Sequence, residues 1–129
     1  MNVSALPGKR VLVIEDTEQN MRLFRAILRM EGAEVLEADG GRAGIALAER
    51  EHPDVIIMDI QMPDMDGLTA TRLLRARPQT RDIPVIAVTA SVMDGDRDKT
   101  FEAGCDGYIS KPIDPAVFGE QVAAFLRSS

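Results

Sequence analysis

Cysteine, long apolar runs and positive charge are all scarce in this 129-residue chain. Cys105 is the single cysteine, so no disulfide bond can form within the chain. No run of about twenty apolar residues and no secretory signal segment is visible. From these absences we expect a soluble protein of the reducing cytoplasm.

Basic residues are outnumbered, with 15 Lys and Arg against 21 Asp and Glu, which gives a formal net charge of -6. Nucleic acids and anionic membranes favour a basic protein face, so we expect neither as a partner. The single histidine, His52, and Cys105 offer no zinc cluster. The length and the apolar content of 45% fit one compact domain over residues 1–129, with about residues 1–8 as an N-terminal extension and no output domain.

Apolar runs alternate along the chain with segments of helical periodicity, which is typical of strand–helix–strand units around a parallel sheet. We expect strands near residues 10–14, 34–38, 54–58, 84–88 and 108–110, and helices near 18–30, 42–51, 67–77, 92–103 and 114–126. The economical arrangement is an α/β fold: a doubly wound, five-stranded parallel sheet in the order 2-1-3-4-5, with five helices.

Polar side chains follow the apolar runs at the points where the strands should end. Glu15 and Asp16 follow the first run, Asp59 the third and Thr89 the fourth, while Lys111 follows the fifth. In the expected order the first and third strands are neighbours, so three carboxylates meet at the carboxyl edge of the sheet. Such a group calls for a divalent cation, and oxygen ligands suit Mg²⁺. We therefore interpret Asp59 as a candidate nucleophile for a phosphoryl group, with Lys111 as the cation and Thr89 as the hydroxyl.

Four stretches resemble the receiver domain of two-component response regulators, the CheY-like superfamily. They are V-L-V-I-E-D (11–16), D-V-I-I-M-D-I-Q-M-P-D-M-D-G (54–67), I-P-V-I-A-V-T-A (83–90) and G-Y-I-S-K-P-I (107–113). The resemblance implies a bacterial phosphorelay protein with a flavodoxin-like fold. It also implies that Asp59 accepts phosphate from a phosphohistidine on a sensor histidine kinase or a phosphotransfer protein. Asp16 would then ligate Mg²⁺ directly, Glu15 through water and Gln61 through its backbone carbonyl.

The resemblance assigns further roles by position. Thr89 and Tyr108 would form a switch that changes the effector-binding face made by the fourth helix, fifth strand and fifth helix. Lys111 precedes a proline, and in the family this peptide bond is often cis. Gln61 and Ser91 occupy positions that tune the dephosphorylation rate in the family.

The nearest subgroup is the single-domain regulators resembling DivK, through E-D-T-E-Q-N-M-R-L-F (15–24), T-A-S-V-M-D-G-D (89–96) and G-C-D-G-Y-I-S-K-P-I (104–113). Thr17 and Glu15 depart from the usual pattern, since asparagine and aspartate are commoner at those positions. Two alternatives remain open: a receiver domain cut from a hybrid histidine kinase, and a phosphatase of similar topology. Gln61 stands where such a phosphatase carries a second aspartate, which favours a switch over a catalyst.

The first helix carries an apolar surface wider than a surface helix needs. We expect one of two explanations for Met21, Phe24 and Leu28. Either the helix is deeply packed, or these side chains help to dock the phosphoryl donor. Burial of all three would exclude the docking hypothesis.

Overall fold

The computed structural model describes residues 6–90 and 94–127. The strands are β1 (Arg10–Ile14), β2 (Glu34–Ala38), β3 (Val55–Asp59), β4 (Val85–Thr89) and β5 (Gly107–Ser110). The helices are α1 (Glu18–Met30), α2 (Gly41–Glu51), α3 (Gly67–Arg75), α4 (Asp94–Glu102) and α5 (Phe118–Arg127).

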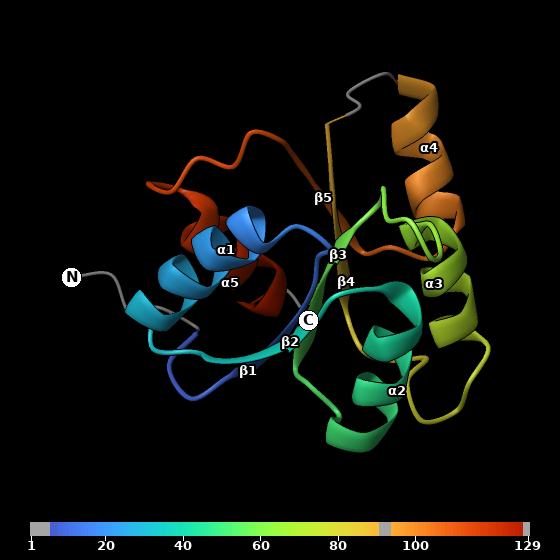
Figure 1. Cartoon of the computed structure of the whole chain (residues 1–129), viewed down its shortest axis with the longest axis horizontal. Coiled ribbons are helices and arrows are strands. Elements are labelled where there is room, and N and C mark those ends of the chain that lie inside the picture. Colours follow the sequence, from blue (N-terminus) through green and yellow to red (C-terminus); the bar gives the residue numbers. More distant parts are fainter. Residues whose placement is uncertain (1–5, 91–93, 128–129) are drawn as a thin grey trace.

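The strands form one parallel sheet in the order β2-β1-β3-β4-β5, which confirms the expected topology. Helices α1 and α5 cover one face of the sheet, and α2, α3 and α4 cover the other (Figure 1). Both faces of the central strands are therefore shielded from water, which explains why their sequences are continuously apolar rather than alternating.

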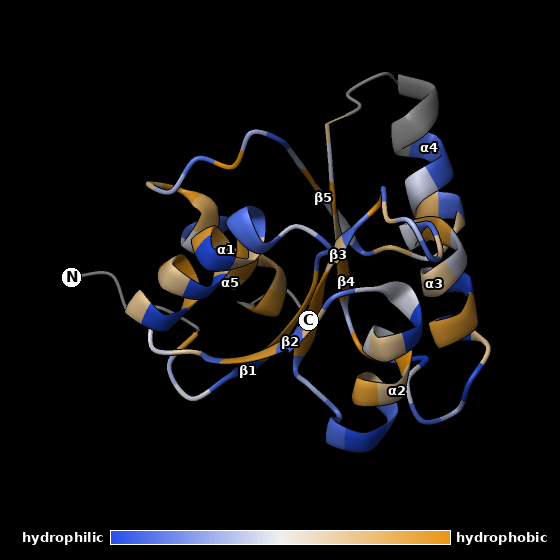
Figure 2. Ribbon diagram, viewed as in Figure 1, coloured by the Kyte–Doolittle hydropathy of each residue, from blue (hydrophilic) through white to orange (hydrophobic). Residues whose placement is uncertain are grey.

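Alternate residues of each strand enter two separate cores. Val11, Val13 and Ile57 pack with the α1 and α5 side, whereas Leu12 and Ile56 pack with the α2 and α3 side. All five residues of β3 and of β4 are buried, and the strands stand out as apolar in Figure 2. The sheet is thus the rigid support for the residues that follow its strands.

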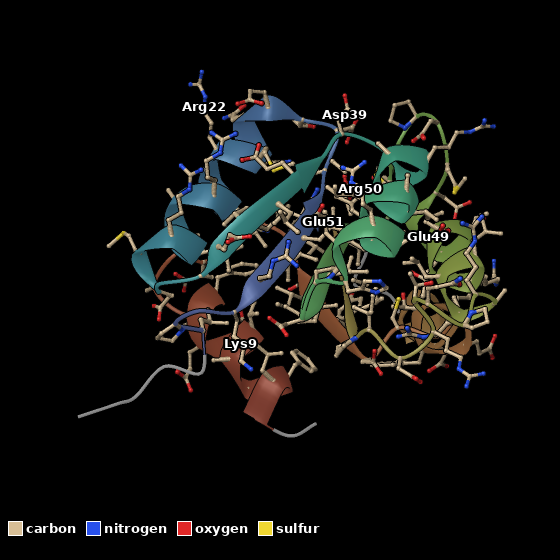
Figure 3. All side chains as sticks on the ribbon, turned by 90° about the horizontal axis from the view of Figure 1, so that it is seen from below. Lys9, Arg22, Asp39, Glu49, Arg50 and Glu51 are labelled. Carbon is tan, nitrogen blue, oxygen red and sulfur yellow. The ribbon has the colours of Figure 1, made fainter. Side chains whose placement is uncertain are left out.

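The amino and carboxyl edges of the sheet lie at opposite ends of the molecule. Figure 3 shows Lys9, just before β1, at one end and Asp39, just after β2, at the other. Residues that follow parallel strands therefore gather at the Asp39 end. Within the described ranges, no helix has the length and apolar character needed to cross a membrane.

Two helix boundaries differ from the sequence-based expectation by two residues or more. Helix α5 begins at Phe118 rather than near 114, because Asp114 forms a turn: its carboxylate accepts the Ala116 N–H at 2.9 Å and its carbonyl accepts the Phe118 N–H at 3.0 Å. Helix α3 ends at Arg75 rather than Arg77, because the Arg77 N–H bonds to the Leu74 carbonyl three residues back, as in a 3₁₀ turn, instead of continuing the α-helical pattern. The expected start of the fourth helix at 92, and Ser91, lie outside the described residues.

The hypothesis that Met21, Phe24 and Leu28 dock the phosphoryl donor is wrong. Their exposed fractions are 4%, 1% and 0%, so all three belong to the core. Helix α1 is covered on two sides, by the sheet and by α5, and the Phe24 ring centroid lies 5.3 Å from that of Phe118. The broad apolar surface of α1 reflects this double packing.

Candidate functional site

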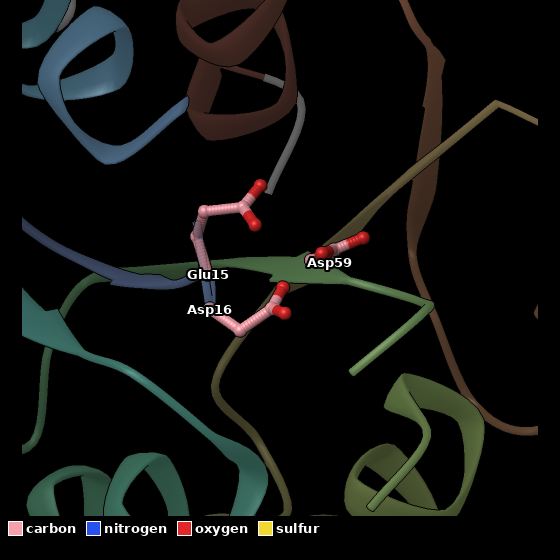
Figure 4. Close-up of side chains that lie close together, drawn as sticks. All are labelled: Glu15, Asp16 and Asp59. Carbon is pink, nitrogen blue, oxygen red and sulfur yellow. The ribbon is translucent and has the colours of Figure 1, made fainter. Parts of the chain in front are cut away.

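Three carboxylates converge at the carboxyl ends of β1 and β3. Glu15 and Asp16 directly follow β1, and Asp59 is the last residue of β3. Because Ile14 pairs with Met58 in the parallel register, Glu15 is brought beside Asp59. One oxygen from each of the three side chains lies within 4.8 Å of the others, and Figure 4 shows the three side chains grouped where their strands end. The sheet topology therefore assembles the acidic group expected from the sequence.

The three carboxylates differ in how far they are buried. Glu15 is 2% exposed and Asp59 is 4% exposed, whereas Asp16 faces solvent. Burial, followed by the neighbouring Asp59 carboxylate, raises the pKa of Glu15 to about 7, against the opposing effects of the Thr17 N–H and the Lys111 ammonium. Thr17 precedes α1, but its side chain makes no capping bond, and its N–H donates instead to Glu15 Oε2 at 3.2 Å.

Lys111 places an ammonium group between the two buried carboxylates. Its Nζ lies 3.3 Å from Asp59 Oδ1 and 3.4 Å from Glu15 Oε1. The Lys111–Pro112 peptide bond is cis, as expected from the family pattern. With all three carboxylates ionised, one ammonium leaves two negative charges uncompensated.

Thr89 and Tyr108 lie on the neighbouring strands. Thr89 ends β4 and is 4% exposed, and its carbonyl accepts the Lys111 N–H at 2.8 Å. Tyr108 on β5 is half-buried and pairs with Ala87 of β4. The hydroxyl and the aromatic ring expected to form the switch are thus carried by adjacent strands next to Lys111.

The β3–α3 loop, residues 60–66, borders the carboxylates. The Gln61 N–H donates to Asp59 Oδ1 at 3.2 Å, and Gln61 and Asp16 line the same groove. The Gly67 N–H closes the loop by donating to the Ile60 carbonyl at 2.8 Å. Gln61 therefore lies beside the cluster, while ligation through its carbonyl stays a prediction.

Two features of this region were not recognised from the sequence. Asp64 binds the first turn of α2, where Gly40 makes room for its carboxylate and Gly41 makes room for Met65. The paired glycines before a helix and the acidic residue after Met62-Pro63 were the available signals. The second feature is a pocket of about 340 Å³ between α1 and the β5–α5 loop, lined by Asn20, Leu23, Phe24, Ala90, Lys111, Pro112 and Ile113.

The donor set fits Mg²⁺. All of the clustered ligand atoms are carboxylate oxygens, which suit a hard cation, and the two uncompensated charges match one divalent ion. The exposure of Asp16 leaves one side of the cluster open to water and to a phosphoryl oxygen. Glu15, Asp16 and Asp59 are therefore the residues that could hold the ion.

Known proteins share this architecture. The family model described as the response regulator receiver domain matches residues 11–123. The polar-differentiation response regulator DivK of Brucella ovis is 43% identical over 118 residues, which cover 92% of this chain and 96% of that protein.

Solved structures agree with these sequence matches. A putative response regulator of Chloroflexus aurantiacus has a TM-score of 0.88 at 28% identity, covering 93% of this chain and 98% of that one. The receiver domain of a sensor histidine kinase from Pseudomonas aeruginosa PAO1, which has a magnesium ion coordinated in its active-site cleft, has a TM-score of 0.85 at 34% identity, with coverages of 93% and 98%.

Proposed function

Because the chain belongs to the response regulator receiver domain family, which acts in two-component signalling, we propose that Asp59 is its phosphoacceptor. The observation that carries this proposal is the convergence of Glu15, Asp16 and Asp59 with the ammonium of Lys111. Asp59 is the member of the group that ends the central strand β3 and contacts both Lys111 and the Gln61 N–H.

The reaction is the transfer of a phosphoryl group from a phosphohistidine. A carboxylate oxygen of Asp59 forms a bond to phosphorus while the bond from phosphorus to the imidazole nitrogen breaks. The electron pair of the broken bond stays on that nitrogen, which takes a proton, and Asp59 becomes an acyl phosphate. Lys111 and the hydroxyl of Thr89 compensate the charge on the phosphoryl oxygens.

Mg²⁺ would be held by Asp16 directly, by Glu15 through water, by Asp59 and by the backbone carbonyl of Gln61. When bound, it neutralises charge on the phosphoryl group and on the carboxylates. Asp16 and Glu15 then orient the ion beside Asp59 rather than taking part in the covalent step.

The donor is a sensor histidine kinase or a histidine phosphotransfer protein. We place its docking site at the pocket beside Lys111, where the half-buried Leu23 and Ile113 offer apolar surface and Asn20 a polar edge. This position lies next to the phosphoacceptor, so a helix that carries the phosphohistidine could reach both.

The output is a change in protein contacts. Movement of Thr89 toward the phosphoryl group, coupled to rotation of Tyr108, would alter the surface formed by α4, β5 and α5, to which an effector binds. The likeness to DivK supports action as a single-domain regulator, for which we propose a cytoplasmic location. The likeness to a receiver domain of a sensor kinase supports the alternative of a larger parent protein, and the size of the native protein on an immunoblot separates the two.

The test is incubation with a small acyl phosphate, with and without Mg²⁺, followed by intact mass measurement. The proposal requires a gain of one phosphoryl group that depends on Mg²⁺ and is lost in Asp59→Asn. A receiver that catalyses only its own phosphorylation and dephosphorylation should carry the added mass, whereas a phosphatase of similar topology should release phosphate catalytically and accumulate no adduct.

A further inference from the structure

Asp64, in the middle of the β3–α3 loop, caps a helix that belongs to a different part of the chain. Its Oδ1 accepts the Gly41 N–H at 3.1 Å and its Oδ2 accepts the Arg42 N–H at 3.2 Å. N–H groups in the first turn of a helix lack partners inside the helix, and the helix dipole favours a carboxylate there. These bonds, the one from Arg42 first, lower the pKa of Asp64.

The two glycines at the start of α2 leave the space that the loop occupies. A Cβ added at Gly40 would lie 2.8 Å from Asp64 Oδ1, and one at Gly41 would lie 3.0 Å from the Cβ of Met65. The φ angle of Gly40 is -169°, a value that any residue adopts, so its backbone does not require glycine. Close approach of the loop is the reason for the glycine at this position.

The ends of the loop are fixed by contacts of their own. The Gln61 N–H bonds to Asp59 Oδ1 at one end, and at the other Asp66 accepts the Thr69 N–H of α3 at 2.8 Å. Asp64 adds a contact across 23 positions that ties the middle of the loop to α2. The loop is therefore anchored at Gln61, at Asp64 and at Asp66.

We propose that Asp64 is a positioning residue for the metal site. By binding the N-terminus of α2, it holds the loop so that the backbone carbonyl of Gln61 faces the carboxylate cluster. Both of its oxygens are engaged by backbone N–H groups, so it acts through the loop rather than as a ligand. This inference rests on the proposed function, because it assigns Gln61 to the metal.

A role of Asp64 in stabilising α2 alone predicts a different experimental result. If Asp64 served only the stability of α2, its loss would lower the melting temperature and leave the affinity for Mg²⁺ unchanged. If it positions the loop, its loss weakens Mg²⁺ binding, and changes to groups that support metal ligands typically cost about tenfold or more in affinity.

The experiment measures the dissociation constant for Mg²⁺ alone by calorimetric titration of wild type, Asp64→Ala and a matched control, Asp54→Ala. Asp54 also accepts a backbone N–H through its carboxylate, that of Arg10 at 2.8 Å, but at the opposite edge of the sheet. We expect Asp64→Ala to bind Mg²⁺ about tenfold more weakly and Asp54→Ala to match wild type. Raising the Mg²⁺ concentration to saturation should bring the phosphorylation rate of Asp64→Ala back toward that of wild type.

Gly40→Ala tests the same contact from the other side and keeps the carboxylate. Its Cβ should push Asp64 away and weaken Mg²⁺ binding, whereas in the Asp64→Ala background the same substitution should add little. Equal Mg²⁺ affinity in wild type, Asp64→Ala and Gly40→Ala would overturn the inference. If Asp64→Ala fails to fold, Gly40→Ala and Asp64→Asn carry the comparison. Wild type that takes no phosphoryl group would instead defeat the proposed function.

Discussion

The ammonium nitrogen of Lys111 lies 3.3 Å from Oδ1 of Asp59, although 52 positions of sequence separate the two residues. This ion pair is formed within a cluster of three carboxylates, and Lys111 also lies 3.4 Å from Glu15. In the proposed reaction the lysine would compete with a metal ion for the same negative charge before transfer, and would pair with the phosphoryl group after it.

Replacing Lys111 should separate metal binding from phosphoryl transfer. In Lys111→Ala three carboxylates remain without their cation, so we expect Mg²⁺ to bind several-fold more tightly, while the rate of phosphorylation at saturating Mg²⁺ falls. Lys9→Ala, an exposed lysine at the other end of the sheet, is the control. Weaker Mg²⁺ binding in Lys111→Ala would contradict this account of the charge balance.

Thr89→Ala should uncouple phosphorylation from the response. The substitution removes a hydroxyl at the end of β4 and leaves Asp59 and the acidic pair in place. We expect Asp59 still to be modified, but the NMR shift changes at Tyr108 and along α5 that accompany phosphorylation in wild type should be greatly reduced. Full shift changes in Thr89→Ala would show that the switch does not depend on this hydroxyl.

Substitutions at two neighbouring residues of α1, Phe24 and Leu23, should affect different properties, the first stability and the second phosphotransfer. Phe24 is in the core against Phe118, so Phe24→Ala should lower the free energy of unfolding by about 3–5 kcal/mol, as measured by urea denaturation. Leu23 lines the pocket beside Lys111, so Leu23→Ala should slow phosphotransfer from a phosphohistidine protein more than from a small acyl phosphate. Equal slowing with both phosphoryl donors would exclude a role of this pocket in docking the phosphohistidine protein.

The pair formed by Arg25 and Glu37 should give a pH-dependent contribution to stability. The Arg25 guanidinium donates to both Glu37 oxygens, at 2.6 and 2.7 Å, and lowers the pKa of Glu37 below its usual value. A carboxyl group whose pKa is lower in the folded state stabilises that state at pH values above its unfolded-state pKa. This stabilisation is lost as the pH falls through the folded-state pKa.

The side chains are 27% and 31% exposed, so solvent screens the pair and the expected contribution to stability is small. The stability of wild type relative to Glu37→Gln, measured in urea, should therefore be larger at pH 7 than well below pH 4. A difference that stays constant over this range would contradict the assignment to Glu37.

Much of the fold and the cluster could be predicted because the signals are local. Apolar runs buried on both faces predict parallel strands, and the residue that follows each strand is read directly from the sequence. Glu15, Asp16, Asp59, Thr89 and Lys111 therefore lie at the expected edge. The sheet order follows from the handedness of the connections.

The remaining features depend on contacts between distant segments. The apolar surface of α1 has the same pattern whether it binds a partner or packs under α5, and only the position of Phe118 distinguishes the two. The contact between Asp64 and α2 likewise appears only when the loop and the helix are brought together. The start of α5 was misplaced because Asp114-Pro115 forms a turn with the same residues that commonly begin a helix.

The central claim is that Asp59 carries the phosphoryl group, and the most direct measurement locates that group. Wild-type protein treated with a small acyl phosphate and Mg²⁺ is reduced with borohydride, which converts an aspartyl phosphate to homoserine, and the fragments are then analysed by mass spectrometry. The account predicts the conversion at residue 59, with none at Asp16 or Asp64. Conversion at another carboxylate, or a phosphoryl group on a residue that borohydride leaves unchanged, would contradict it.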